Sequence, residues 1–121
     1  MASYRMDRIT EDIKRELIYI LREVKDPRVS DMLNVVKVDV SNDLSYCKVY
    51  VSDVKGIENT KESVKGLKSA SGFIRRRLGE SLHLRKIPEL KFTADDSIEK
   101  SFELYEKLKN IHFSEDNDGK N

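Results

Sequence analysis

The residues of this chain best suited to bind another molecule lie at positions 66–78, where small side chains are followed by three consecutive arginines. Gly72 has no Cβ, and Ala70 and Ser71 have small side chains, so a nucleic-acid backbone can come close to the main chain there. The N–H groups that open a helix after such a corner attract phosphate, and neighbouring cations strengthen that attraction. The pattern equally fits a tight corner between two packed helices with a solvated run of charge, and the segment alone favours neither interpretation.

Charge is unevenly distributed along the sequence. The formal net charge is only +1, but positions 60–91 hold nine basic and three acidic residues, a net charge of +6. Positions 95–118 hold three basic and eight acidic residues, a net charge of −5. Attraction of polyanions at one part and repulsion at another favours an oriented binder. We therefore predict an RNA-binding surface formed by Lys61, Lys65, Lys68, Ser69, Ala70, Ser71, Gly72, Arg75, Arg76, Arg77, Arg85 and Lys86.

The side chains that could catalyse a reaction do not have the sequence spacing of a catalytic motif. His83 and His112 are far apart in the sequence, and neither has the spacing of a metal ligand. No serine lies in a nucleophile elbow, and the sequence has no P-loop or dinucleotide-binding glycine motif. Asp95 and Asp96 are better explained as a strand end and a helix cap than as a catalytic carboxylate pair. We expect no enzymatic activity, no metal and no cofactor.

The composition fits one small domain. The 121 residues are 37% charged and 38% hydrophobic, which provides apolar material for a single core under an ionic surface. Cys47 is the one cysteine, so an internal disulfide and a zinc site of several thiolates are excluded, as suits a reducing compartment. No apolar run reaches the roughly 18 residues of a membrane helix. We expect a cytoplasmic protein that contacts no membrane.

The first half of the chain predicts a helix and a hairpin. Apolar residues at steps of three and four predict a helix over 6–24, which Asp26-Pro27 ends because the residue before a proline avoids helical geometry. Alternating valines predict strands at 34–41 and 46–52. The turn around Asn42-Asp43 is so short that the two strands must pair in antiparallel fashion.

The second half predicts two helices around the corner, a third strand and a last helix. Thr60 is expected to cap the helix that runs to 69–72, and a core stripe at 74, 78 and 82 marks the next helix. Residues 90–94 alternate as a strand, and Asp96 with Glu99 resembles a capping box. The predicted class is α+β, with helices covering a three-stranded mixed sheet in a domain over 1–113. The polar tail 114–121 is predicted to be disordered.

Three aromatic side chains have two interpretations each. Phe73 lies off the core stripe of its helix, where it would either stack on a base or, as we prefer, pack at the helix junction. Tyr46 and Tyr50 share the non-core face of a predicted strand with Lys48, an arrangement that fits a platform for stacked RNA bases. Strands favour tyrosine in any case, and a helix could cover this face, so the platform is the less favoured interpretation.

The order of the elements, with its small-residue corner, resembles a type II KH domain, a fold that holds nucleotide backbones at a GXXG loop. More specific stretches resemble the ribosome-binding factor A family; they are Asp26-Pro27-Arg28-Val29, Val38-x-Val40-Ser41-x-Asp43-Leu44-Ser45-x-x-Lys48-Val49-Tyr50-Val51-Ser52, Ala70-Ser71-Gly72-Phe73-Ile74-Arg75 and Leu84-Arg85-x-x-Pro88-Glu89-Leu90-x-Phe92-x-x-Asp95. In that family an Ala-x-Gly kink replaces GXXG, and Ala70-Ser71-Gly72 matches it. With a single glycine, close approach of phosphate is limited to one side of the corner.

The resemblance implies an assembly factor that binds the immature small (30S) ribosomal subunit. Such a factor assists late maturation of 16S rRNA near its 5′ end, supports growth in the cold and leaves before translation begins. The implied protein is a monomer, with an assembly GTPase as a further partner. A different class of function is kept open, in which the chain is a protein-interaction module that recruits a protein through its acidic last helix without touching RNA.

Overall fold

The computed structural model describes the backbone of residues 2–119 and the side chains of residues 5–111. Helix α1 spans Ala2–Arg22 and buries the stripe Ile13, Leu17 and Ile20. It ends two residues before the predicted position. The chain then turns at Asp26-Pro27, where the N–H of Val29 donates to the carbonyl of Asp26 at 2.9 Å.

Three strands form one mixed sheet in the order β1-β2-β3. Strand β1 (Leu33–Val40) pairs antiparallel with β2 (Tyr46–Asp53), and β2 pairs parallel with β3 (Glu89–Ala94). The register of β1 shifts by one residue between Val35 and Lys37, an irregularity that the alternation of valines does not reveal. Cys47 is fully buried on β2, and this burial raises the pKa of its thiol to about 12, so it serves as a small apolar side chain.

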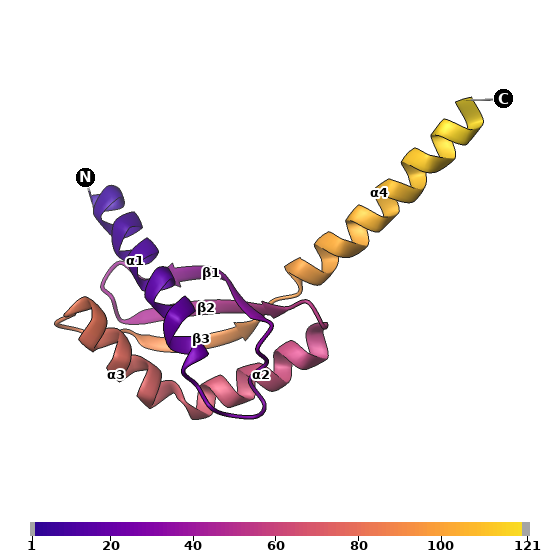
Figure 1. Cartoon of the computed structure of the whole chain (residues 1–121). Helices are drawn as coiled ribbons and strands as arrows, with labels where there is room; N and C mark the ends of the chain where they lie inside the picture. The colour runs from indigo at the N-terminus through magenta and orange to yellow at the C-terminus, as the bar shows by residue number, and fades with distance from the viewer. Residues whose placement is uncertain (1, 120–121) are drawn as a thin grey trace.

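Helices α2 (Ile57–Ser69) and α3 (Ser71–Leu82) meet at a sharp corner and, with α1, lie on the same side of the sheet (Figure 1). Leu67, Ile74 and Leu78 are fully buried between these helices and the sheet. They contact the apolar face of the strands, which presents Val49, Val51 and Phe92. The predicted α+β class, the order of the elements and the three-stranded mixed sheet are therefore confirmed.

Thr60 does not cap α2, contrary to the prediction. Helix α2 begins three residues earlier, after Gly56, whose φ of 118° is in the left-handed region that favours glycine. The hydroxyl of Thr60 instead accepts a hydrogen bond from the N–H of Asp53 at 3.0 Å and donates to the carbonyl of Gly56 at 3.0 Å. This buried hydroxyl fastens the first turn of α2 to the end of β2.

The predicted capping box of the last helix is also not formed. Helix α4 spans Ser97–Gly119, and the carboxylate of Asp95 accepts the N–H of Ser97 at 2.7 Å. Glu99 points away from its own helix, because its Oε2 accepts the N–H of Ile57 at 3.1 Å. It therefore caps the neighbouring helix α2 and fixes the first turn of α4 to it.

Beyond that first turn, α4 extends away from the rest of the molecule (Figure 1). Its apolar side chains Phe102, Tyr105 and Leu108 are each more than half exposed. Among the elements that the structure describes, none of the helices consequently lies over the centre of the sheet face opposite α1, α2 and α3 (Figure 1). The backbone of residues 114–119 continues α4, whereas the sequence predicts disorder over 114–121. Disorder of this tail in solution stays a prediction, and residues 120–121 lie outside the described backbone.

Candidate nucleic-acid interface

The corner between α2 and α3 is a single residue, Ala70. Its backbone angles of φ −95° and ψ 7° leave helical geometry, while its N–H still donates to the carbonyls of Gly66 and Leu67, each at 3.1 Å. Its own carbonyl accepts the N–H of Ile74 at 3.0 Å, so α3 starts without a gap. The hydroxyl of Ser71 donates back to the carbonyl of Lys68. The corner is thus a hydrogen-bonded bend, with the opening turn of α3 on its outer side.

The two glycines around the corner have different roles. A Cβ on Gly66 would lie 2.6 Å from Val29 Cγ2 and 3.2 Å from Asp26 Cγ, so this glycine is required for packing against the turn after α1. A Cβ on Gly72 would meet nothing within 4 Å, and Gly72 is exposed. The fold itself gives no reason for a glycine at position 72. The free space above it is available to an approaching molecule.

The turn after α1 reaches the corner, which sequence reasoning did not predict. Asp26 accepts three hydrogen bonds from Arg28, from the backbone N–H at 2.9 Å, from Nε at 3.0 Å and from Nη2 at 2.7 Å. These bonds lower the pKa of the Asp26 carboxyl to about 2. Arg28 Nη2 also donates to Ser69 Oγ at 3.1 Å, so its guanidinium lies beside the corner. The Asp-Pro-Arg sequence that follows α1 is the feature of the sequence from which this contact could have been predicted.

The three consecutive arginines do not form one patch. Arg75 is part of the fold, since its Nε donates to the carbonyl of Pro88 at 3.1 Å and its Nη2 to that of Ile87 at 2.9 Å. Arg77 is paired with Glu23 through bonds of 3.0 and 2.8 Å, and the paired carboxylate raises the pKa of its guanidinium. The predicted RNA-binding surface therefore does not present three free guanidinium groups, because Arg75 and Arg77 have partners within the protein.

Arg76 is exposed, as Arg75 is, but unlike those of Arg75 and Arg77 its guanidinium donates no hydrogen bond to a described residue. Its guanidinium lies 6.0 Å from the ring centre of Phe73, and it has no ion-pair partner among the described residues. Phe73 itself is partly buried against the core, which confirms its predicted place at the helix junction. Lys68, at the end of α2, is likewise exposed and unpaired within the part of the chain that is described.

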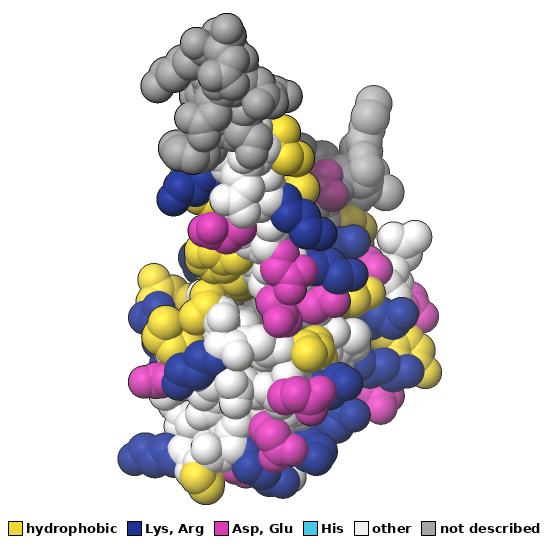
Figure 2. Space-filling view, turned by 90° about the vertical axis from the view of Figure 1, so that its right-hand side faces the viewer, with side chains coloured by type: hydrophobic (Ala, Val, Ile, Leu, Met, Phe, Trp, Pro, Cys, Tyr) yellow, Lys and Arg dark blue, Asp and Glu magenta, His cyan; other side chains and the backbone are white. Residues whose placement is uncertain are grey.

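The remaining predicted cations are less available. Lys61 and Lys65 pair with acids one turn earlier on α2, Glu58 at 3.8 Å and Glu62 at 2.9 Å. Figure 2 shows basic and acidic side chains next to one another over one face of the molecule, without a region of a single sign. In the loop before β3, Lys86 donates to Ser45 Oγ at 3.1 Å, while Arg85 is exposed. Within the described part of the chain, the side chains of Lys68 and Arg76 therefore remain at the corner without an ion pair or a hydrogen bond, and Arg28, paired with Asp26, lies beside them.

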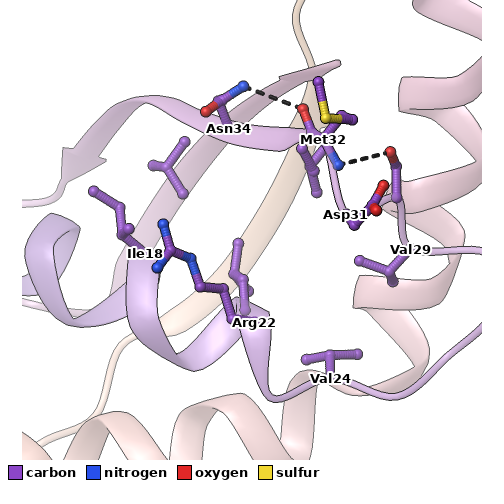
Figure 3. A pocket seen from close by; sticks show the side chains of 11 residues that line it. Ile18, Arg22, Val24, Val29, Asp31, Met32 and Asn34 are labelled. Carbon is purple, nitrogen blue, oxygen red and sulfur yellow. Dashed lines mark hydrogen bonds between the residues drawn. The ribbon is translucent and has the colours of Figure 1, made fainter. Parts of the chain in front are cut away.

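A groove of about 600 Å³ lies between the end of α1 and the chain that leads into β1 (Figure 3). Ile18, Val24 and Val29 supply apolar walls, and Arg22 extends along one side. The backbone of Met32 is satisfied locally, by Asn34 Nδ2 at 3.1 Å and Ser30 Oγ at 3.0 Å. The described lining residues include no nucleophile paired with a base.

Comparison with known proteins decides the family. The family model described as ribosome-binding factor A matches residues 5–108. The chain belongs to the ribosome-binding factor A family. Among curated members of this family, the protein of Clostridium tetani (strain Massachusetts / E88) is 46% identical over 121 residues, which are 99% of this chain and 100% of that protein. The Treponema denticola member is 42% identical over 120 residues, covering 98% of this chain and 91% of its own length.

Solved structures of the family have the same fold. The crystal structure of ribosome-binding factor A from Thermus thermophilus gives a TM-score of 0.64 at 26% identity, covering 73% of this chain and 92% of that one. A homology model of the Thermus thermophilus factor, fitted into the cryo-electron-microscopy map of a 30S–RbfA complex, gives a TM-score of 0.62 at 26% identity, covering 74% of this chain and 93% of that one.

Two further observations concern only the described part of the chain. No helix there combines the length and the apolar character that crossing a bilayer requires. The same residues contain no cluster of three or more histidine, cysteine or acidic side chains placed to hold a metal ion.

Proposed function

We propose that this chain is an assembly factor that binds the immature small (30S) ribosomal subunit in the cytoplasm and assists late maturation of 16S rRNA near its 5′ end, in the cold as well. Membership of the ribosome-binding factor A family supports this function. The observation that carries the proposed site is the exposed Gly72 at the opening of α3, with room above its backbone. The chain acts through binding energy and catalyses no reaction.

The geometry of the corner supports contact with phosphate. A phosphate that approaches the opening turn of α3 meets backbone N–H groups and the positive end of the helix dipole. Lys68 and Arg76 lie before and after that turn, and both are free of ion pairs with described residues. Arg28 also lies beside Ser69, but its charge is already paired with Asp26 at 2.7 Å. Two phosphates neutralised by Lys68 and Arg76 predict a fall of log affinity with log salt at a slope of about −1.4 to −1.8.

The experiment compares charge reversals that leave the fold intact. Lys68→Glu with Arg76→Glu removes the two unpaired cations, whereas Arg75 and Arg77 are spared because they hold the structure together. We expect this double variant to bind purified immature subunits at least about tenfold more weakly at low salt. The matched control, Lys100→Glu with Lys107→Glu on α4, carries the same change of charge far from the corner and should retain wild-type affinity.

Two results would contradict this site. An unchanged affinity of the Lys68 and Arg76 variant at low salt would remove the corner from the interface. A salt titration without slope would argue against a phosphate contact altogether. Sedimentation of cell lysate provides the cellular test, in which the factor should travel with free small subunits and be absent from translating ribosomes.

One observation favours a protein partner as a second function. Helix α4 exposes apolar side chains along one side, where Phe102 is 59% and Tyr105 62% exposed. An exposed apolar surface of this kind is typical of a site that binds another protein. Capture of a protein by the full chain from nuclease-treated extract, an assembly GTPase for example, would support this function. Loss of all partners after nuclease treatment would leave the ribosomal RNA as the sole contact.

A further inference from the structure

The sheet face turned away from α1, α2 and α3 is open at its centre. Its middle strand presents Tyr46, Lys48 and Tyr50, of which Tyr46 is 48% exposed. Lys37 on β1 lies opposite Tyr50, and Lys91 on β3 lies opposite Lys48. Two tyrosines and three lysines from all three strands therefore share one face. Helix α4, which could have covered it, leaves the sheet beyond this region (Figure 1).

Two of the lysines on this face repel each other, which lowers the stability of the sheet. Lys48 and Lys91 are directly opposite in the register of β2 and β3, and like charges in that position destabilise a sheet. None of the three lysines forms an ion pair with a described residue. Asp39 on β1 is directly opposite Lys48 and offsets part of this repulsion, and Glu89 is directly opposite Tyr46, so three cations face two acids. An anionic ligand would remove the repulsion between the two facing lysines.

The tyrosine rings lie against these cations. The ammonium of Lys91 is 4.8 Å from the ring centre of Tyr46, and that of Lys37 is 5.8 Å from the ring centre of Tyr50. Both lysine stems are flexible, so an ammonium can leave its ring when a flat ligand takes its place. Tyr46 and Tyr50 are four residues apart on one strand, about 13 Å at 3.3 Å per residue. Lys48 stands between them on the same face.

We propose that this open face is a second RNA-binding site, at which two bases of a single-stranded segment stack on Tyr46 and Tyr50 while Lys48 and Lys91 bind the phosphates between them. Aromatic faces and cations along an open strand match single-stranded RNA in both chemistry and charge. A duplex does not fit, because its bases are already stacked on one another. The identification of the nucleic acid as RNA rests on the proposed function.

This site is separate from the corner. The corner belongs to the helical layer on one face of the sheet (Figure 1), whereas Tyr46 and Tyr50 alternate with the buried Cys47 and Val49 and so lie on the other face. A short strand cannot occupy both places at once. The protein would consequently hold two different segments of ribosomal RNA and fix their relative positions.

The experiment uses the full chain with a 12-nucleotide oligouridylate as the single-stranded probe and a 12-base-pair RNA duplex as its counterpart. The sequence contains no tryptophan, so Tyr46→Trp introduces one reporter on the open face. We expect the oligouridylate to quench this fluorescence and the duplex to leave it unchanged. Tyr46→Ala should weaken oligouridylate binding by about 5- to 150-fold, the effect of losing one stacked base. Tyr105→Ala on α4, also an exposed tyrosine, is the matched control and should bind as wild type.

A second variant separates binding from folding. Lys91→Glu places opposite charges across β2 and β3, so its melting midpoint should equal or exceed that of the wild type. Its oligouridylate affinity should nevertheless fall, and the slope of log affinity against log salt should become shallower by about 0.7. A stable Lys91→Glu variant with full affinity would overturn the phosphate contact.

The same measurements distinguish this site from the corner. Lys68→Glu with Arg76→Glu should leave the oligouridylate quench intact while it weakens binding to immature subunits. Absence of the quench, or equal quenching by inorganic polyphosphate, would overturn base stacking even if subunit binding persists. Unchanged subunit binding by the Lys68→Glu with Arg76→Glu variant would overturn the corner as a site and would leave the proposal for the open face unaffected.

Discussion

Gly66 and Gly72 lie one on each side of the corner, and alanine at the two positions should have opposite effects on stability. At Gly66 the new Cβ would lie 2.6 Å from Val29 Cγ2, so the packed turn after α1 has to move. Such overpacking costs about 1–3 kcal/mol, against a gain of about 1 kcal/mol from replacing glycine within a helix. Gly66→Ala should therefore lower the free energy of unfolding by up to about 2 kcal/mol.

Gly72→Ala should instead stabilise the protein. The new methyl group meets no atom within 4 Å, so only the gain in helix propensity remains, at most about 1 kcal/mol. For a chain of this length, 1 kcal/mol corresponds to a change in melting temperature of about 3–6 °C. Urea unfolding followed by circular dichroism gives both free energies, and the two alanine variants should differ by up to about 3 kcal/mol.

The same pair of variants tests the site. Gly72→Ala should weaken binding to immature subunits although it raises stability, because the methyl group occupies the space above the corner. Gly66→Ala, measured well below its melting temperature, should retain its affinity. The reasoning is refuted if Gly72→Ala is the less stable protein of the two, or if its methyl group leaves subunit affinity unchanged.

Two further predictions concern charged side chains. Arg75→Met removes hydrogen bonds to two carbonyls before β3 and should lower the free energy of unfolding by about 1–2 kcal/mol in urea titrations; an unaltered midpoint would show that the bonds do not hold α3 to the strand. The Asp26 carboxyl, with a pKa lowered from 3.8 to about 2, stabilises the folded state above pH 4 and loses this effect as the pH falls toward 2. The urea midpoint of wild type should thus fall more steeply between pH 4 and 2 than that of Asp26→Asn, and parallel curves would contradict the assignment.

Local periodicity was sufficient to predict the elements of the fold. Steps of three and four among Ile13, Leu17 and Ile20, and alternation around Val49 and Val51, depend only on which face of each element is buried. The corner at Ala70 was likewise visible as a cluster of small residues between two helical stripes. These signals are properties of neighbouring residues, and they remained correct in the folded chain.

Side-chain partners could not be predicted, because they join residues far apart in the sequence. Arg77 looked like a free cation until α1 brought Glu23 within 2.8 Å, and Arg75 faces carbonyls twelve and thirteen residues away. Glu99 resembled part of a capping box on its own helix, yet it caps α2 from 42 residues away. Charge counts along a sequence therefore overestimate the free charge of a surface.

The projecting helix α4 affects how the size of this protein in solution should be judged. Its 23 residues are about 35 Å long at 1.5 Å per residue, whereas a compact chain of this size has a radius of gyration near 14 Å. Such an elongated particle elutes from a sizing column ahead of a sphere of equal mass. Early elution would thus be expected of a single molecule, and counting its copies requires light scattering or sedimentation equilibrium.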